Sequence, residues 1–468
     1  MVKPKQSLAY QRPHKRTVGW EMSRKYQRIG DRMQRPASIL VAMYQGYPGG
    51  SDTPFYTPIF ARLVERGHTV RILIGPGVRE TRLPVSERHL QRLTDLCATI
   101  VPFRQPETHP LDNMPPARGL VGRWMPSQFR SIAQQALTIL WASAWADNVA
   151  AELRRTPTDV LVADYVLLGA LVGAEAERVH SVALQHMVGP RPATGLPPFG
   201  TGWPSSHAPV GKARNALGRF AIESLYRRNG LSLLNAVRAQ HKLPPLRSVF
   251  EQYDRASRVL MLVSPSFDFP RPKKPANMRQ VGTPMGDPGT ADWEPPWPDG
   301  NRPLVVASLS TLPQGQAALM RNILLALSKL DVYALVTLGL SLDPADFVAP
   351  PNVVLERFVP HSVVLPQAAV LVTQCGIGTV TKGLMYGVPL VCVPILADQP
   401  DNAARVAERG AGIHIASNAS PDQIAVAIKR VLGDQSFRGA AQQLGAAMAR
   451  EGDAVDNVIS AIEEIILT

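Results

Sequence analysis

The chain has 468 residues, of which 45% are hydrophobic and 19% are charged, and its formal net charge at pH 7 is +13. This length suits two or three domains, and the hydrophobic content excludes a chain that is disordered throughout. The sequence contains no run of about 18 apolar residues, which excludes a predicted transmembrane helix.

The amino-terminal segment 1–36 carries most of the charge, with ten Lys and Arg residues and two acidic ones, a net of +8 that leaves +5 for the other 432 residues. Because the body is only mildly basic, we expect no nucleic-acid partner. The segment is typical of a disordered tail, or of translation from a start codon upstream of a true start at Met33. It has no apolar h-region and does not match a secretory signal, although such a basic tail can contact an anionic membrane surface peripherally.

The three cysteines, Cys97, Cys375 and Cys392, have a spacing that matches no metal-ligand pattern. A sparse and odd number of cysteines favours buried thiols in a reducing compartment. We therefore expect a cytoplasmic protein, in contact with a membrane surface at most peripherally.

The first half of the chain alternates between strand and helix patterns. An apolar run at 38–43 is followed by the glycine-rich stretch QGYPGGSD, by apolar residues at helical spacing over 54–67, and by a second apolar run at 69–75. This order is typical of a parallel doubly wound sheet. Three further strands continue the series, at 159–164, 181–186 and 258–264. Long amphipathic stretches lie between them, at 127–155 and 211–242. We assign 37–285 to an amino-terminal Rossmann-like domain.

A segment rich in Pro, Gly and Asp, 269–303, interrupts the series, and we expect its part 286–303 to link two domains, with Trp293 and Trp297 packed onto a domain surface. A second series of near-continuous apolar strands follows at 304–310, 331–339, 353–359, 369–374 and 389–394, with helical stretches at 315–329 and 420–432. Such strands predict a sheet covered on both faces. The fold class is therefore α/β, with two Rossmann-like domains facing across a cleft. The second domain spans 304–450, and we expect a final helix at 451–468 that can return to the first domain.

The sequence TQCGIGT, residues 373–379, places Gly376 and Gly378 where the strand 369–374 ends and a helix begins. Open α/β sheets bind ligands at this end of their strands. Glycines let the backbone approach an anion, which the N–H groups and the helix dipole then stabilise. Thr379 can add a hydroxyl donor or cap the helix. A glycine turn also occurs for steric reasons alone, so the pattern by itself leaves both interpretations open.

The next predicted strand ends in a loop with Asp398, Gln399 and Asn402, which a parallel sheet brings beside the glycine loop. Carboxylate and amide groups next to an anion site suit a polyhydroxylated group attached to a phosphate. Asp398 can alternatively cap the following helix, but Asp401 is the better cap candidate, which would free Asp398.

The 55 residues from Phe358 to Gly412 resemble the nucleotide-sugar-binding signature of family 1 glycosyltransferases, the UDP-glycosyltransferase superfamily with the GT-B fold, and bacterial members that glycosylate antibiotics and lipids in particular. The strand LVVASLST, the linker WEPPWP and the segment GHTVRIL extend the resemblance more loosely. It implies transfer of a sugar, with inversion, from a UDP- or dTDP-sugar to a hydroxyl of an apolar small-molecule or lipid acceptor. No cofactor is implied beyond the nucleotide sugar as cosubstrate. No metal is expected either, because no carboxylate pair with metal-ligand spacing adjoins the glycine loop.

The alternative is a catalytically impaired relative that acts as a nucleotide-binding or partner protein. The oligomeric state is not predicted.

The resemblance also implies a set of donor-binding residues. It assigns the nucleobase to Phe358 and Val359, the diphosphate to the loop Gln374–Thr379 with Gly376 and Gly378, the ribose position to Lys382, the sugar hydroxyls to Asp398 and Gln399, and a small-residue loop near the phosphates to Ser308, Ser310 and Thr311. Gln374 stands where the family has a histidine. Its amide can donate but never carries a charge, at a cost of about 1–3 kcal/mol for the lost charge-assisted bond. Lys382 can supply a compensating cation.

The position of the family's acceptor base falls on Asp52. An aspartate of ordinary pKa is a poor base for an alcohol, so Asp52 either acts on an acidic acceptor or has its pKa raised by burial, and it can also cap a helix that has Pro54 just inside. His186 and Asp164 each end a strand. His186 faces the cleft or is structural, and Asp164 orients a partner or caps. Apolar residues at 113–146, among them Met114, Trp124, Met125, Phe129, Trp141 and Trp145, line an acceptor pocket or pack the core.

Overall fold

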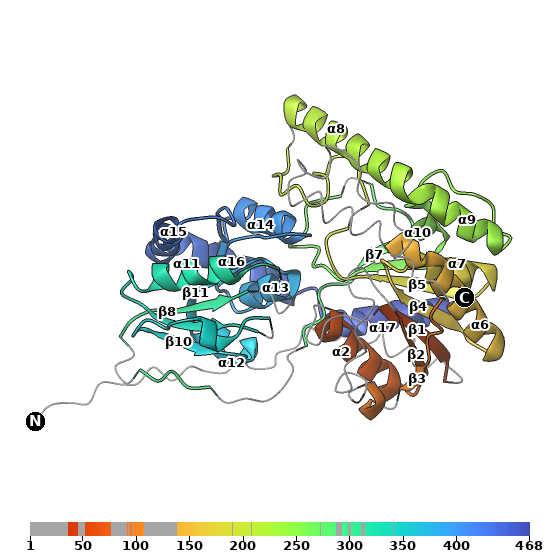
Figure 1. The fold of residues 1–468 in the computed structure, drawn as a ribbon, viewed down its shortest axis with the longest axis horizontal. Helices are drawn as coiled ribbons and strands as arrows, with labels where there is room; N and C mark the ends of the chain where they lie inside the picture. Colours follow the sequence, from red (N-terminus) through yellow and green to blue (C-terminus); the bar gives the residue numbers. More distant parts are fainter. Residues whose placement is uncertain are drawn as a thin grey trace, which may run out of the picture.

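The computed structural model describes residues 36–44, 52–75, 91, 93–96, 98–106, 138–189, 191–206, 208–271, 273–286, 293–297, 301–309, 314–339 and 341–468, with backbone only at 52–54 and 138. Figure 1 shows two α/β units side by side, each built around a parallel sheet. The predicted α/β fold class with two Rossmann-like domains is confirmed.

The first sheet has seven strands in the described residues, all parallel, in the order β3-β2-β1-β4-β5-β6-β7. Their bounds are β1 (Ser38–Tyr44), β2 (Thr69–Gly75), β3 (Thr99–Val101), β4 (Val160–Asp164), β5 (His180–Gln185), β6 (Arg258–Met261) and β7 (Met278–Gln280). The chain runs outward from β1 to β3 and then returns to β4 beside β1. The order of strands therefore reverses between β1 and β4, and the carboxyl ends of these two strands form the place where such sheets bind ligands.

Helices cover this sheet and extend beyond it. They are α2 (Asp52–Glu65), η1 (Thr138–Trp141), α6 (Ala142–Arg155), α7 (Leu168–Ala176), α8 (Pro209–Tyr226), the π-helical turn η2 (Arg227–Leu231), α9 (Ser232–Gln240) and α10 (Glu251–Arg255). The stretch predicted as amphipathic at 211–242 is the long α8–α9 pair at the top of Figure 1. Of the stretch predicted at 127–155, residues 127–137 lie outside the described part, and the rest forms η1 and α6.

The second sheet has six parallel strands in the described residues, in the order β10-β9-β8-β11-β12-β13. Their bounds are β8 (Leu304–Ser308), β9 (Tyr333–Thr337), β10 (Val353–Glu356), β11 (Ala368–Thr373), β12 (Leu390–Cys392) and β13 (Gly412–His414). The accompanying helices are α11 (Ala317–Leu327), η3 (Pro344–Asp346), α12 (His361–Val364), η4 (Leu365–Gln367), α13 (Ile377–Met385), α14 (Gln399–Glu408), α15 (Pro421–Gly433) and α16 (Gln435–Ala449). Here the order reverses between β8 and β11, so the loop after β11 stands at the second ligand-binding position.

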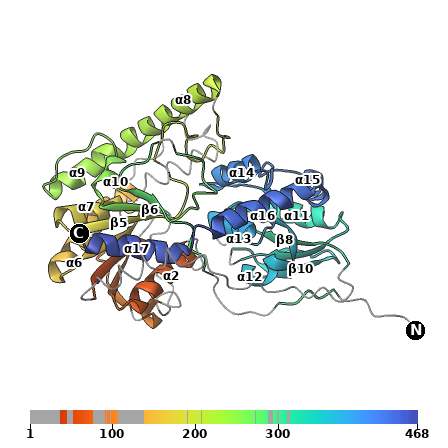
Figure 2. The ribbon, with the colours of Figure 1, turned by 180° about the vertical axis from the view of Figure 1, so that it is seen from behind.

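The two domains are connected more than once. Trp297 stacks on Tyr333 with ring centroids 4.6 Å apart, and Trp293 packs against the core, so the predicted packing of the linker is confirmed. The last helix, α17 (Ala454–Ile466), lies against α2 and strands β4 to β6 of the first domain (Figure 2). Between the domains, residues of 188–199 line a pocket together with Asp401 and Arg405. Within the described part of the chain, no helix is both long and apolar enough to cross a membrane.

Candidate functional site

The glycine loop leaves β11 at its carboxyl end and opens α13. Cys375 has a φ of 69°, which turns the chain sharply, and Gly376 precedes the helix at the N-cap position with φ −58° and ψ 136°. A Cβ built on Gly376 would meet only the Gln374 amide nitrogen Nε2, at 3.5 Å. The space beside Gly376 is therefore bordered by a side-chain donor and by the amino end of a helix, where backbone N–H groups lack helical partners.

Gln374 is buried at the end of β11, and its Oε1 accepts a hydrogen bond of 3.2 Å from the Thr373 hydroxyl. This contact turns the amide nitrogen toward the loop rather than into the sheet. Thr379 lies in the first turn of α13 and is half-buried, and Lys382 is half-buried one turn further along the same helix. The loop thus combines the donor groups that an anion needs, and a lysine on the helix that follows it.

The other domain touches the same helix terminus. A Cβ built on Gly378 would stand 3.2 Å from Phe55 Cζ of α2, so only a small residue at 378 permits this approach. Phe55 is buried, and its ring stacks on His186 with centroids 6.2 Å apart. The first turn of α13 is therefore in direct reach of the first domain.

The loop after β12 lies beside the glycine loop, as predicted from the parallel sheet. Strands β11 and β12 pair directly, and Asn402 Nδ2 donates to the Cys375 carbonyl at 2.9 Å and to Asp398 Oδ2 at 2.8 Å. Gln399 Oε1 accepts from the backbone of Ile395 and Leu396, and its Nε2 donates to Gln314 Oε1 at 3.0 Å. Asp398 and Gln399 are thus held rigidly at the start of α14, next to the loop that follows β11.

The prediction that Asp401 caps α14 is wrong. Asp398 occupies the N-cap position without a capping side-chain hydrogen bond, whereas Asp401 accepts from the backbone of Gly200 at 2.6 Å and of Gly202 at 2.9 Å in the other domain. Gly202 has a φ of 63° and packs against Pro400, so the loop fits there only because it lacks a side chain. Burial raises the pKa of Asp401 to about 6.

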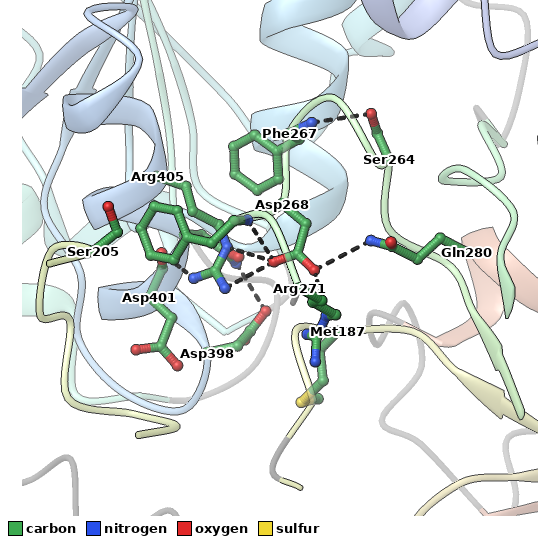
Figure 3. Close-up of polar contacts among 12 residues, drawn as sticks. Met187, Ser205, Ser264, Phe267, Asp268, Arg271, Gln280, Asp398, Asp401 and Arg405 are labelled. Carbon is green, nitrogen blue, oxygen red and sulfur yellow. Dashed lines mark hydrogen bonds and ion pairs between the residues drawn. The ribbon is translucent and has the colours of Figure 1, made fainter. Parts of the chain in front are cut away.

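A second inter-domain contact surrounds Asp268, in the loop that follows β6 (Figure 3). Its carboxylate accepts from Arg405 Nε at 3.0 Å and Nη2 at 2.8 Å, from Arg271 Nε at 2.9 Å and from Gln280 Nε2 at 3.1 Å. The Arg405 guanidinium also lies over the Phe269 ring, 4.2 Å from its centroid. Burial alone would raise the pKa of Asp268, but the two arginines hold it below its ordinary value. These contacts fix α14 to the first domain about two turns from Asp398.

On the first domain, three polar side chains meet at the ends of β4 and β5. The Tyr56 hydroxyl of α2 donates to Asp164 Oδ2 and lies 3.0 Å from His186 Nδ1, and Asp164 Oδ1 accepts from the backbone of Val166 at 2.9 Å. Burial raises the pKa of Asp398, and the Asn402 hydrogen bond and the charge of His186 oppose that rise. His186 thus lies near the start of α14, with its own side chain buried among Phe55, Tyr56 and Tyr165.

The side chain of Asp52 and residues Ser310 and Thr311 lie outside the described residues. Phe358 is 51% exposed in the loop after β10, whereas Val359 is buried. Ser308 ends β8, and its hydroxyl oxygen accepts a hydrogen bond from the Thr337 hydroxyl at 2.9 Å. His361 Nε2 lies 3.3 Å from the same Ser308 oxygen.

The structure resolves the open question for two of the apolar residues. Trp141 and Trp145 are 1% exposed and pack in the core, so they do not line an acceptor pocket, while Met114, Trp124, Met125 and Phe129 lie outside the described residues. Sequence reasoning missed the contributions of Phe55, Tyr56, Gln314 and Arg405. Only Phe55 and Tyr56 gave a signal, as aromatic residues at the start of a helix that follows a glycine-rich loop.

Comparisons with known proteins show relatives over most of the chain. The sequence profile described as "Erythromycin biosynthesis protein CIII-like, C-terminal domain" matches residues 321–465. The 4'-demethylrebeccamycin synthase of Lentzea aerocolonigenes is 30% identical over 446 residues, which cover 92% of this chain and 100% of the relative. Among solved structures, the glycotransferase of kitacinnamycin has a TM-score of 0.67 at 20% identity, covering 91% of this chain and 98% of its own. The glycosyltransferase VinC in complex with DTDP has a TM-score of 0.64 at 19% identity, covering 92% and 99%.

Proposed function

This chain belongs to the family 1 glycosyltransferases of the antibiotic type, sugar-transferring enzymes of the UDP-glycosyltransferase superfamily with the GT-B fold. From this we propose that it uses a UDP- or dTDP-sugar, held mainly by its second domain. The acceptor is an apolar hydroxylated small molecule held mainly by the first domain. Transfer proceeds in one displacement with inversion and without a metal ion. The complex of VinC with DTDP, a fold relative, supports a nucleoside diphosphate as the ligand class.

The observation that carries the proposal is the space beside Gly376. A diphosphate there receives the Gln374 amide hydrogen, the N–H groups at the start of α13 and the Thr379 hydroxyl, with the helix dipole favouring its charge. Gly378 lets the first domain approach the same position through Phe55. Lys382 is the cation on this helix that can offset the absence of a histidine at position 374.

The other donor groups follow from the neighbouring loops. Asp398 and Gln399 accept and donate to the sugar hydroxyls, and the fixed orientation of both side chains lowers the entropy lost on binding. The exposed ring of Phe358 stacks on the nucleobase, and the Val359 backbone pairs with its edge. Ser310 and Thr311 complete the phosphate site from the loop after β8.

In the proposed step the acceptor oxygen forms a bond to the anomeric carbon while the bond from that carbon to the diphosphate oxygen breaks. The electron pair leaves with the nucleoside diphosphate, so negative charge grows at the Gly376 loop. The loop's preorganised donors stabilise this charge more in the transition state than in the ground state. The acceptor must also lose its proton. Asp52 stands where the family places the residue that takes it, and Asp52→Asn tests that assignment.

A thermal-shift screen with UDP, dTDP, GDP and ADP tests the proposal directly. We expect UDP or dTDP to raise the melting temperature, because a ligand at 100 times its Kd stabilises the folded state by about 2.7 kcal/mol. Sugar transfer is then followed by mass spectrometry with UDP-glucose and dTDP-glucose against a panel of aromatic alcohols and phenols. If no nucleoside diphosphate stabilises the protein, the proposed donor site is wrong.

A further inference from the structure

The first domain has its own ligand-binding position, where the order of strands reverses between β1 and β4. Three buried polar side chains from separate elements converge there: Tyr56 from α2, Asp164 from the end of β4 and His186 from the residue after β5, exposed by 2%, 2% and 1% respectively. A buried carboxylate costs several kcal/mol unless it is hydrogen-bonded, so the contacts of Asp164 decide the stability of this cluster.

The hydrogen bonds of this cluster run in one direction. Tyr56 has one hydroxyl hydrogen, and its short contact with Asp164 Oδ2 uses it, since a carboxylate only accepts. The tyrosine oxygen can then only accept from His186 Nδ1, 3.0 Å away. Asp164 is held in place by the Val166 N–H at 2.9 Å. The proton of the neutral imidazole therefore sits on Nδ1, and Nε2, on the opposite edge of the ring, is the basic nitrogen.

The imidazole also lies at the boundary between the domains. One face stacks on Phe55, whose Cζ reaches the position of a Cβ on Gly378, and the ring of Tyr165 meets it edge-on at 5.6 Å between centroids. The histidine thus lies on the first-domain side of Phe55, whose ring separates it from the first turn of α13.

We propose that His186 takes the proton from the acceptor hydroxyl, at the end of a His186–Tyr56–Asp164 hydrogen-bond chain. This inference rests on the proposed function. As the acceptor oxygen bonds to the anomeric carbon, its proton moves to Nε2, and the leaving diphosphate departs with the electron pair. The positive charge on the imidazolium is stabilised by the Asp164 carboxylate, both through Tyr56 and directly, since Asp164 Oδ2 lies 3.4 Å from Nδ1. Solvent takes the proton after the products leave. Tyr56 and Asp164 are positioning residues in this scheme.

The first test reads the histidine directly and needs no turnover. Long-range ¹H–¹⁵N NMR on protein with ¹⁵N-labelled histidine gives the tautomer of each ring. The chain has ten histidines, and the signal of His186 is the one that disappears in His186→Gln. We expect hydrogen on Nδ1 in the wild type, and a weaker preference in Tyr56→Phe, where Asp164 Oδ2, 3.4 Å from Nδ1, remains as an acceptor. Hydrogen on Nε2 in the wild type overturns the proposal.

The second test separates proton removal from structure. With UDP-glucose or dTDP-glucose, His186→Gln should lower kcat toward 4-methylphenol by roughly 10²–10⁴-fold, the usual contribution of a general base, while UDP and dTDP still raise the melting temperature as in the wild type. The loss toward 4-nitrophenol should be much smaller, because that acceptor is already largely ionised. Tyr56→Phe should show the same pattern with a smaller loss.

Tyr253→Phe is the matched control. It also removes a buried hydroxyl near β4, one that donates to the Tyr165 carbonyl at 2.9 Å, and we expect lower stability with unchanged discrimination between the phenols. Equal losses toward both phenols in His186→Gln, or a loss confined to Asp52→Asn, overturn the assignment of His186. If UDP and dTDP do not bind the wild type, the proposed function is wrong instead. The tautomer of His186 then still shows whether the hydrogen-bond chain exists.

Discussion

Replacing Gly376 with alanine tests the diphosphate site with little effect on the fold. The residue has φ −58° and ψ 136°, which alanine adopts without strain, and the new methyl would meet only Gln374 Nε2 at 3.5 Å, an ordinary van der Waals distance. We expect the free energy of unfolding to change by less than about 1 kcal/mol, because the gain from a stiffer unfolded chain and the loss at the N-cap position nearly cancel.

Binding should respond quite differently. A phosphate oxygen that accepts from Gln374 must lie about 2.7–3.2 Å from Nε2, in the space that the methyl begins to fill. Loss of one hydrogen bond to a charged group is worth about 1.5–3 kcal/mol, or roughly a 10- to 100-fold weaker Kd. Isothermal titration calorimetry with UDP and dTDP measures this, with Gly439→Ala in α16 as the control, where a Cβ meets nothing within 4 Å. Equal affinities for the two variants would refute the reasoning.

Three further predictions concern the surroundings of this site. Gln374→Ala should weaken nucleotide binding by about 10- to 100-fold in calorimetry, whereas Gln374→His should raise kcat, since an imidazolium adds a charge-assisted bond to the leaving group. Arg405→Met should lower the free energy of unfolding in urea by about 3 kcal/mol, the lower end of the range for breaking a buried pair, because Asp268 keeps Arg271 and Gln280; an unchanged midpoint would contradict this. Asp401 has a pKa of about 6 in the folded state against 3.8 as its ordinary value, so the folded state binds more protons between these pH values and stability from this group falls as pH rises from about 4 to 6. Asp401→Asn should make the difference in the free energy of unfolding between urea titrations at pH 4.5 and pH 7 smaller by about 2 kcal/mol.

The strong apolar runs made most of both sheets predictable. The strands expected at 38–43, 69–75, 159–164 and 181–186 agree with β1, β2, β4 and β5 to within one residue at each end. Strands β3, β7 and β13 were not predicted, since each has three residues and occupies a sheet edge, where one short run carries little pattern. β7 also lies within the Pro- and Gly-rich segment 269–303, whose composition is typical of a linker.

The site was predictable only where the chain itself brings residues together. The glycine loop and the Asp398 loop follow neighbouring parallel strands, so their proximity follows from the order of elements. The carboxylate of Asp401 illustrates the limit. A helix start predicts a cap, but its partners, Gly200 and Gly202, are about 200 residues away and belong to the other domain. The same holds for Tyr56, Asp164 and His186, which are separated by more than 100 residues from first to last and meet only through the fold.

The two ligand-binding positions are joined by the helix that carries the proposed sugar contacts. α14 begins beside Asp398, and within two turns Asp401 and Arg405 bind loops of the first domain. Any movement between the domains must therefore shift the start of α14 against the glycine loop, unless these buried contacts break. Phe55 packs between His186 and the donor loop. The separation of these two parts therefore also depends on the contacts of Asp401 and Arg405 that hold the domains together. Proton removal and departure of the diphosphate, which occur on different domains in the proposed reaction, thus depend on one rigid connection. Arg405→Met should then slow transfer even when nucleotide binding, which needs only the second domain, is retained.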